Sequence, residues 1–155
     1  MKKFTVLVCI IALLVSLAGC GKQAPEDEII SIAARTTEAL NKMAEEIKEA
    51  DNADAILAIV QKHTKTIEGL AKRAMELVAS LDRDAVQALG NNEEFIRNII
   101  KAGEDYDEAE ENVTSSIMDL PEDQMSIVMN SPDFDEAGEK LGNALEIIEQ
   151  LIRGK

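Results

Sequence analysis

The stretch 25–47, PEDEIISIAARTTEALNKMAEEI, contains the pattern that determines the fold. Pro25 suits the first position of an α-helix, and the three acidic residues after it favour the positive end of the helix dipole. Apolar or small residues then recur at alternating spacings of four and three, which places them on one helical face. They are Ile29, Ala33, Thr36, Leu40, Met43 and Ile47. The stretch therefore predicts a long amphipathic helix that packs against other helices.

The same pattern recurs in three later segments, whose apolar faces run along 56–77, 95–117 and 134–151. Each segment is preceded by residues that favour a helix start. These are Asp51 or Asn52 for the second helix, Asn91 with Glu94 for the third, and Ser131 with Pro132 for the fourth. Two shorter helical pieces are expected at 82–89 and 122–129, the second of them starting after a proline that ends the third helix.

These four amphipathic segments predict an all-α fold, an antiparallel four-helix bundle with two short connecting helices. The composition agrees, because only Phe95, Tyr106 and Phe134 supply aromatic rings after residue 20, so aliphatic side chains must fill the core. The main alternative is a long hairpin of the first two helices that closes only against another subunit. We favour the single-chain bundle because the third and fourth helices supply matching apolar faces.

The beginning of the chain carries a different signal. Lys2 and Lys3 precede an apolar run over 6–17, which is the order of charge and hydrophobicity in a secretory signal peptide. Leu17-Ala18-Gly19-Cys20 then resembles the lipobox of bacterial lipoproteins. The resemblance implies that Cys20 receives a diacylglycerol on its thiol, that the chain is cut before it, and that the new amino terminus is acylated. No family is identified for the rest of the chain.

This interpretation divides the chain into a signal peptide (1–19), a lipidated cysteine with a short tether (20–24) and an acidic helical domain (25–155). The tether spans at most ~14 Å, so the domain and its partners should lie close to the membrane. Gly21 follows the cysteine where enterobacterial inner-membrane lipoproteins typically carry Asp. By resemblance this favours the outer membrane, facing the periplasm, with the cell surface as the alternative.

Charge restricts the partners. The formal charge of the whole chain is -14, and it becomes -16 once the signal peptide leaves with Lys2 and Lys3. Such a domain is repelled by nucleic-acid phosphates and by anionic lipid head groups. A basic protein partner or a cation is compatible with it. We therefore expect the membrane to be reached through the lipid on Cys20 and the protein partner to be membrane-proximal or a second copy of the chain.

His63 is the only histidine, and it lies on the apolar face of the second helix. If the first two helices form a hairpin, His63 approaches Met43, and a His–Met pair inside a bundle could hold a haem or a metal. The simpler interpretation is a histidine at the edge of the core that is hydrogen-bonded to a neighbour. We favour it because no other feature of a haem or metal site accompanies the pair, so no cofactor is expected.

Three groups of residues are candidate partner-binding elements. The methionines around the Pro121 corner could form an adaptable apolar surface, two glycines four positions apart could admit another helix backbone, and an acidic run could dock a basic partner. Each group also has a purely structural explanation, as core filling, local packing or a solvated helix face. The groups are Met118, Met125 and Met129; Gly138 and Gly142; and Glu104, Asp105, Asp107 and Glu108.

No arrangement of nucleophile and base, and no glycine-rich phosphate loop, occurs in the sequence. With one histidine and no cysteine after Cys20, the usual catalytic groups are missing. The sequence therefore predicts a membrane-anchored, non-enzymatic interaction or scaffold lipoprotein. The alternative is a helical bundle that binds a small molecule, a metal or a haem.

Overall fold

The computed structural model describes residues 24–153. Within this range the chain forms six α-helices and no strand, which confirms the predicted all-α class. The predicted signal peptide and Cys20 lie outside the described residues. In chain order the helices are α2 (Pro25–Lys48), α3 (Ala53–Ser80), α4 (Arg83–Asn91), α5 (Glu93–Met118), α6 (Glu122–Met129) and α7 (Pro132–Arg153).

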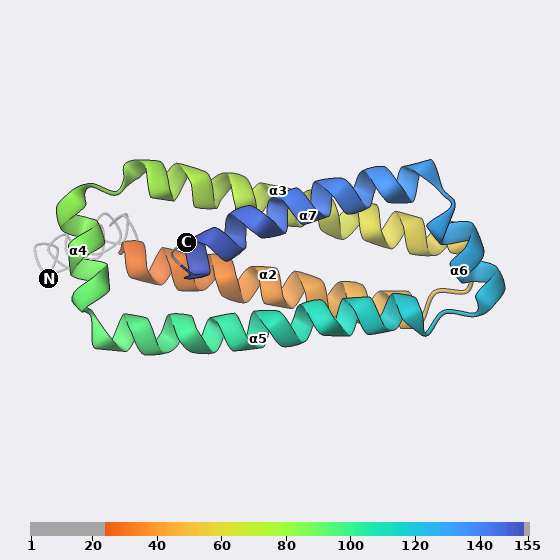
Figure 1. Ribbon diagram of the computed structural model, residues 1–155, viewed down its shortest axis with the longest axis horizontal. Helices are drawn as coiled ribbons and strands as arrows, with labels where there is room; N and C mark the ends of the chain where they lie inside the picture. Colours follow the sequence, from red (N-terminus) through yellow and green to blue (C-terminus); the bar gives the residue numbers. More distant parts are fainter. Residues whose placement is uncertain (1–23, 154–155) are drawn as a thin grey trace, which may run out of the picture.

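The four long helices α2, α3, α5 and α7 lie along the long axis of the molecule, and the short helices α4 and α6 cross its two ends (Figure 1). α2 and α5 run in one direction, whereas α3 and α7 run in the other. α2 packs most extensively against α5 and also contacts α3, while α3 packs against α7. The contact between α5 and α7 is much smaller. The closest helix pairs are thus parallel, because α4 and α6 carry the chain across each end.

Side-chain caps fix where three helices begin. The Asn52 side chain accepts a hydrogen bond from the backbone N–H of Ala55 at 2.9 Å, and Asp82 does the same for Ala85 at 2.8 Å. At the start of α5 the capping residue is Asn92, whose side chain accepts from the N–H of Phe95 at 3.0 Å. The predicted cap at Asn91 is therefore wrong by one residue, because α4 continues through Asn91 before the backbone turns extended.

The core runs between the long helices and is made of aliphatic side chains. Every residue predicted on the apolar face of the first helix, from Ile29 to Ile47, is buried, and the face of α3 from Ile56 to Leu77 is buried as well. Leu40, at the centre of α2, has no exposed surface. The two faces that the sequence defined most clearly therefore meet in the interior.

The face of α5 is buried over only part of its length. Tyr106, Ala109 and Val113 are buried, but Phe95 and Ile99 are half-exposed. The reason is the position of α7, whose last turn lies beside the middle of α5: a Cβ added at Gly103 would meet Ile152 at 3.5 Å. The first turns of α5 extend past this point. None of the described helices has the length and apolar character needed to cross a membrane.

Candidate functional site

The end of the molecule formed by α6 exposes large apolar side chains. We define the α6 end as residues 118–132, from the last residue of α5 to the first of α7. Met118, Ile127 and Met129 have 67%, 61% and 56% of their surface exposed. Met125 is half-buried, and Val128 is buried in the core. The structure thus separates the three predicted methionines into two that face solvent and one that fills the corner.

Ile127 belongs to this surface, although the sequence analysis missed it. The signal was present in the helical period: Val128 and Met125 lie three residues apart and turn inward, so Ile127 between them must turn away from the core. Single exposed apolar side chains are common, but three of them within residues 118–129 make this end a candidate binding surface. Acidic residues are close to them in the sequence. They are Asp119, Glu122, Asp123, Asp133 and Asp135.

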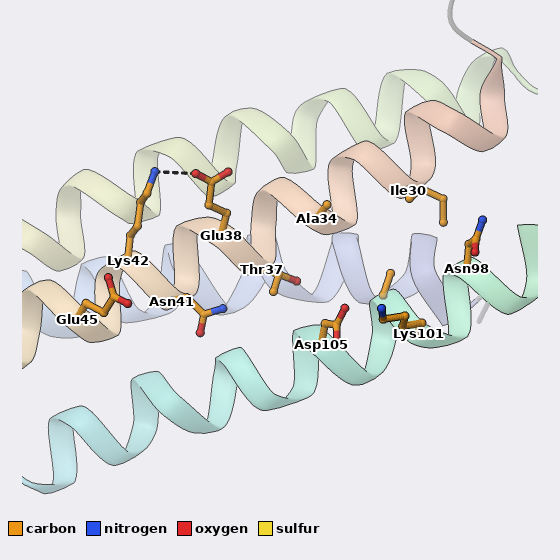
Figure 2. Close-up of a pocket in the computed structure, with 11 residues that line it drawn as sticks. Ile30, Ala34, Thr37, Glu38, Asn41, Lys42, Glu45, Asn98, Lys101 and Asp105 are labelled. Carbon is orange, nitrogen blue, oxygen red and sulfur yellow. Dashed lines mark hydrogen bonds and ion pairs between the residues drawn. The ribbon is translucent and has the colours of Figure 1, made fainter.

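A second candidate site is an open groove of about 640 Å³ between α2 and α5. Figure 2 shows side chains from the two helices lining it, with Thr37 and Asn41 on α2 and Asp105 on α5. Lys42 and Glu38 form an ion pair of 2.6 Å at its rim. The Thr37 hydroxyl is buried and has no hydrogen-bond partner among the described residues. A buried hydroxyl without a partner is unfavourable, so the groove offers one unused polar contact.

Thr37→Val tests whether that hydroxyl is used in solution. In the structure described, the substitution removes an unpaired polar group and should leave the free energy of unfolding equal or raise it slightly. Thr36→Val is the matched control, because the neighbouring Thr36 hydroxyl is buried and donates to the Ile32 carbonyl at 2.9 Å. Its loss should cost ~1 kcal/mol. Urea denaturation of both variants measures the two changes in the free energy of unfolding. A Thr37→Val variant that is as destabilised as Thr36→Val would show that the hydroxyl has a hydrogen-bond partner in solution, either a group of the chain or a bound molecule.

His63 is held by an acidic partner. It is buried on α3, and its Nε2 lies 3.1 Å from the Glu46 carboxylate on α2. Lys62 contacts the same carboxylate at 2.7 Å, and the two contacts hold the pKa of Glu46 below its usual range, Lys62 having the larger effect. Met43 is fully buried. His63 is thus engaged in a hydrogen bond between helices, and no group of metal-ligating side chains gathers within 24–153.

The acidic run of α5 is divided between different surroundings. Glu104 and Glu108 are exposed, and Asp105 lines the groove beside α2. Asp107 points to the opposite side, where it pairs with Arg153 at the end of α7. The four carboxylates therefore do not converge on one point, which argues against a cation held by all of them.

Repulsion between carboxylates accompanies the small contact between α5 and α7. Glu110 is exposed as a residue, but desolvation of its carboxylate raises its pKa, and the nearby Glu149 and Asp107 raise it further, against an opposing effect of Arg153. Burial also raises the pKa of Tyr106, the only tyrosine. A raised carboxyl pKa means that the charged form is less favourable in the folded state than in the unfolded chain.

Glu110→Gln should therefore stabilise the fold at neutral pH. Below the ordinary carboxyl pKa of 4.5 the wild-type side chain is protonated in both states, so the difference should vanish there. Thermal unfolding followed by circular dichroism at neutral and at acidic pH checks this. Glu108→Gln is the control, because it removes the same charge from an exposed position of α5. An equal gain from both variants would attribute the effect to net charge alone.

The two glycines of α7 do not mark a close helix contact within the chain. Gly138 and Gly142 are exposed, and a Cβ added at either would meet nothing within 4 Å. Of the two neighbours that the sequence left open, a helix of the same bundle is therefore not the one, because both glycines turn away from α3, against which α7 packs its buried face. Their exposed face is open to solvent in the described structure.

Searches against protein-family models, curated proteins and solved structures found no significant match. Two candidate binding sites follow from the structure: the exposed apolar end at α6 and the groove between α2 and α5.

Proposed function

We propose that the protein is a bacterial lipoprotein, anchored through a lipid on Cys20 and acting as a non-enzymatic protein-interaction or scaffold module. In this proposal the signal peptide 1–19 is removed, and the four long helices form a four-helix bundle, antiparallel from each long helix to the next along the chain, that stands free of other subunits. The anchored domain faces the periplasm from the outer membrane. The support for the anchor is the lipobox Leu17-Ala18-Gly19-Cys20 and the short tether that follows it.

The observation that carries the interaction role is the α6 end. Three large apolar side chains are exposed there, at the end of the molecule farthest from the start of α2 at Pro25 (Figure 1). Methionine side chains adapt to different apolar partners because they are flexible and polarisable. The carboxylates around them favour a partner with basic residues near an apolar segment. A basic amphipathic segment of another protein fits both properties.

In-cell photo-crosslinking from position 127 tests this role. A photoreactive amino acid in place of Ile127 should give one defined crosslinked species in cells of the native host. The same amino acid at Glu139, an exposed position on α7, is the matched control and should not give that species. Because the reactive group replaces the Ile127 side chain, a crosslink reports contact at this surface and not elsewhere on the protein.

A double variant completes the test. Met118→Gln with Met129→Gln keeps good helix formers at exposed positions, so the fold should remain while the crosslink from position 127 is lost. Circular dichroism confirms the fold, and membrane fractionation confirms the anchor. A crosslink that persists in this variant, or that forms equally from Glu139, would contradict the proposed binding surface.

A second candidate function is the binding of a small molecule in the groove between α2 and α5. The specific observation in its favour is the buried, unpartnered hydroxyl of Thr37 in a groove with both polar and apolar lining. Native mass spectrometry of the protein from its own host would test it. A bound small molecule that Thr37→Val releases supports this function, and a protein that carries no ligand contradicts it.

A further inference from the structure

The end of the molecule opposite α6 also exposes apolar side chains. We define the α4 end as residues 75–100, which comprise the last turns of α3, the whole of α4 and the first two turns of α5. Large apolar residues on all three helices are exposed there, by 38% to 58% of their surface. They are Met75, Val78, Val86, Ile96 and Ile100. This end is therefore a second apolar region, larger than the one at α6.

The geometry of the helices explains why these side chains are left uncovered. α7 ends beside the middle of α5, so the first turns of α5 have no fourth helix next to them. α4 crosses the end of the molecule at a steep angle to the long helices and has no buried residue (Figure 1). At a rise of ~1.5 Å per residue, Met75 and Ile100 both lie within ~11 Å of the end of their helices. The apolar residues thus form a shallow layer at one end.

The chain enters the fold at this same end. Ala24 and Pro25 line a pocket of about 480 Å³ together with Leu81, Asp82 and Ala85, at the junction of α3 and α4. Only the tether 20–24 separates this point from Cys20, and it reaches at most ~14 Å. A lipid on Cys20 therefore brings the α4 end next to the bilayer, whichever way the rest of the domain is turned.

The charge distribution favours one orientation. The α4 end, residues 75–100, has two Lys or Arg and five Asp or Glu, a formal charge of -3. The segment 104–153, which forms most of α5, α6 and α7, has two basic and fifteen acidic residues. Bacterial membranes expose anionic head groups, which repel the segment 104–153 more strongly than the less acidic α4 end. A second copy of this acidic chain would be repelled as well.

We infer that the α4 end is a membrane-docking surface, and that its exposed apolar side chains enter the interfacial layer of the bilayer that holds the lipid on Cys20. This inference rests on the lipid anchor of the proposed function. Side chains in such a layer penetrate by ~5–10 Å, which matches the shallow apolar layer of the α4 end. The domain then stands upright, and the 26 residues of α5 hold the α6 end ~39 Å above the bilayer.

The test uses the full-length chain, expressed in a bacterium, extracted from the membrane fraction and reconstituted into vesicles. The vesicles contain phosphatidylethanolamine and phosphatidylglycerol, with a nitroxide on a fraction of the lipids. Val86→Cys carries a fluorophore at the α4 end, and Ile127→Cys carries it at the α6 end. The two positions are matched in exposure, at 54% and 61%. Ile100→Cys provides a second probe on another helix of the α4 end.

The expected result is several-fold stronger quenching by lipid nitroxides at positions 86 and 100 than at position 127. Equal quenching at all three positions would mean that the domain lies flat, and none at any of them that it stands clear of the bilayer; either result overturns the inference. A probe at position 86 that is shielded from water but not quenched would mean that protein covers this end, which overturns it too.

Intact mass separates the two proposals. A chain that carries the lipid mass and binds vesicles but shows one of these other quenching patterns contradicts only the membrane-docking surface. A chain that lacks the lipid mass and remains off the vesicles contradicts the anchor of the proposed function, and the docking surface falls with it.

Discussion

Cys20→Ser should release the protein from the membrane. In the proposed function the thiol of Cys20 carries the diacylglycerol, and an oxygen at that position does not replace it. No described helix could span a membrane in its place. The membrane-bound fraction is measured by immunoblotting after high-speed centrifugation. Nearly all of the wild-type protein should be bound, whereas Cys20→Ser chains that have lost residues 1–19 should be almost entirely unbound. The reason is that two or more acyl chains give stable attachment and none gives very little.

Cys9→Ser is the matched control for this experiment. Cys9 lies in the signal peptide and leaves with it, so its replacement should change neither the attachment nor the mass of the mature protein. If Cys20→Ser chains that had lost residues 1–19 remained attached to the same extent as Cys9→Ser, the lipid anchor would be wrong. The protein would then be held by a partner.

Leu40→Ala should have the largest effect on stability among single substitutions in α2, lowering the free energy of unfolding by ~2–5 kcal/mol. Leu40 has no exposed surface and lies at the centre of α2, the helix that contacts α3, α5 and α7. Removing most of its side chain leaves a cavity, because the neighbouring side chains belong to several helices and cannot all move in to fill it. Urea denaturation monitored by circular dichroism measures the change.

Ile127→Ala is the control for Leu40→Ala. It removes a similar number of carbon atoms from a side chain that is 61% exposed, so the stability should change by less than ~0.5 kcal/mol. Similar losses in the two variants would mean that the α6 end is packed against something in solution, and a negligible loss in Leu40→Ala would contradict the position of α2 in the core.

The helices themselves could be predicted because each carries a local signal. Pro25 begins α2 and Pro132 begins α7, as expected, and the faces that start at Ile29 and Ile56 are the ones that are buried. Such signals depend on spacing along one helix, and the sequence contains them completely. The predicted cap of α5 was Asn91, one residue before the actual cap, Asn92. Such an error is expected where two consecutive asparagines could each cap the same helix.

What the sequence did not contain is how the helices meet. That α2 pairs most closely with the parallel α5, and that α7 stops beside Gly103, depends on how two short helices turn the chain. For this reason the exposed layer at the α4 end was not predicted, although Ile96 and Ile100 share one helical face. Gly138 and Gly142 left two neighbours open, a helix of the same bundle or a second subunit, and only the structure excludes the first of them.

The exposed apolar side chains of the α6 end were predicted in part. Met118 and Met129 were singled out and are exposed, whereas Ile127 follows only once the inward side of α6 is known. The acidic run of α5 was considered as one surface, but α2 and α7 lie on different sides of it, and they separate Asp105 from Asp107. Residues that are neighbours in a sequence share a helix and need not share a face.

The central claim is that this acidic helical domain is held at a membrane by Cys20, and the intact mass of the protein from its native host tests it most directly. We expect a chain that begins at Cys20, lacks residues 1–19, and carries the added mass of a diacylglycerol and an amide-linked acyl chain. A mature protein that begins at another residue, or an unmodified Cys20, would contradict it.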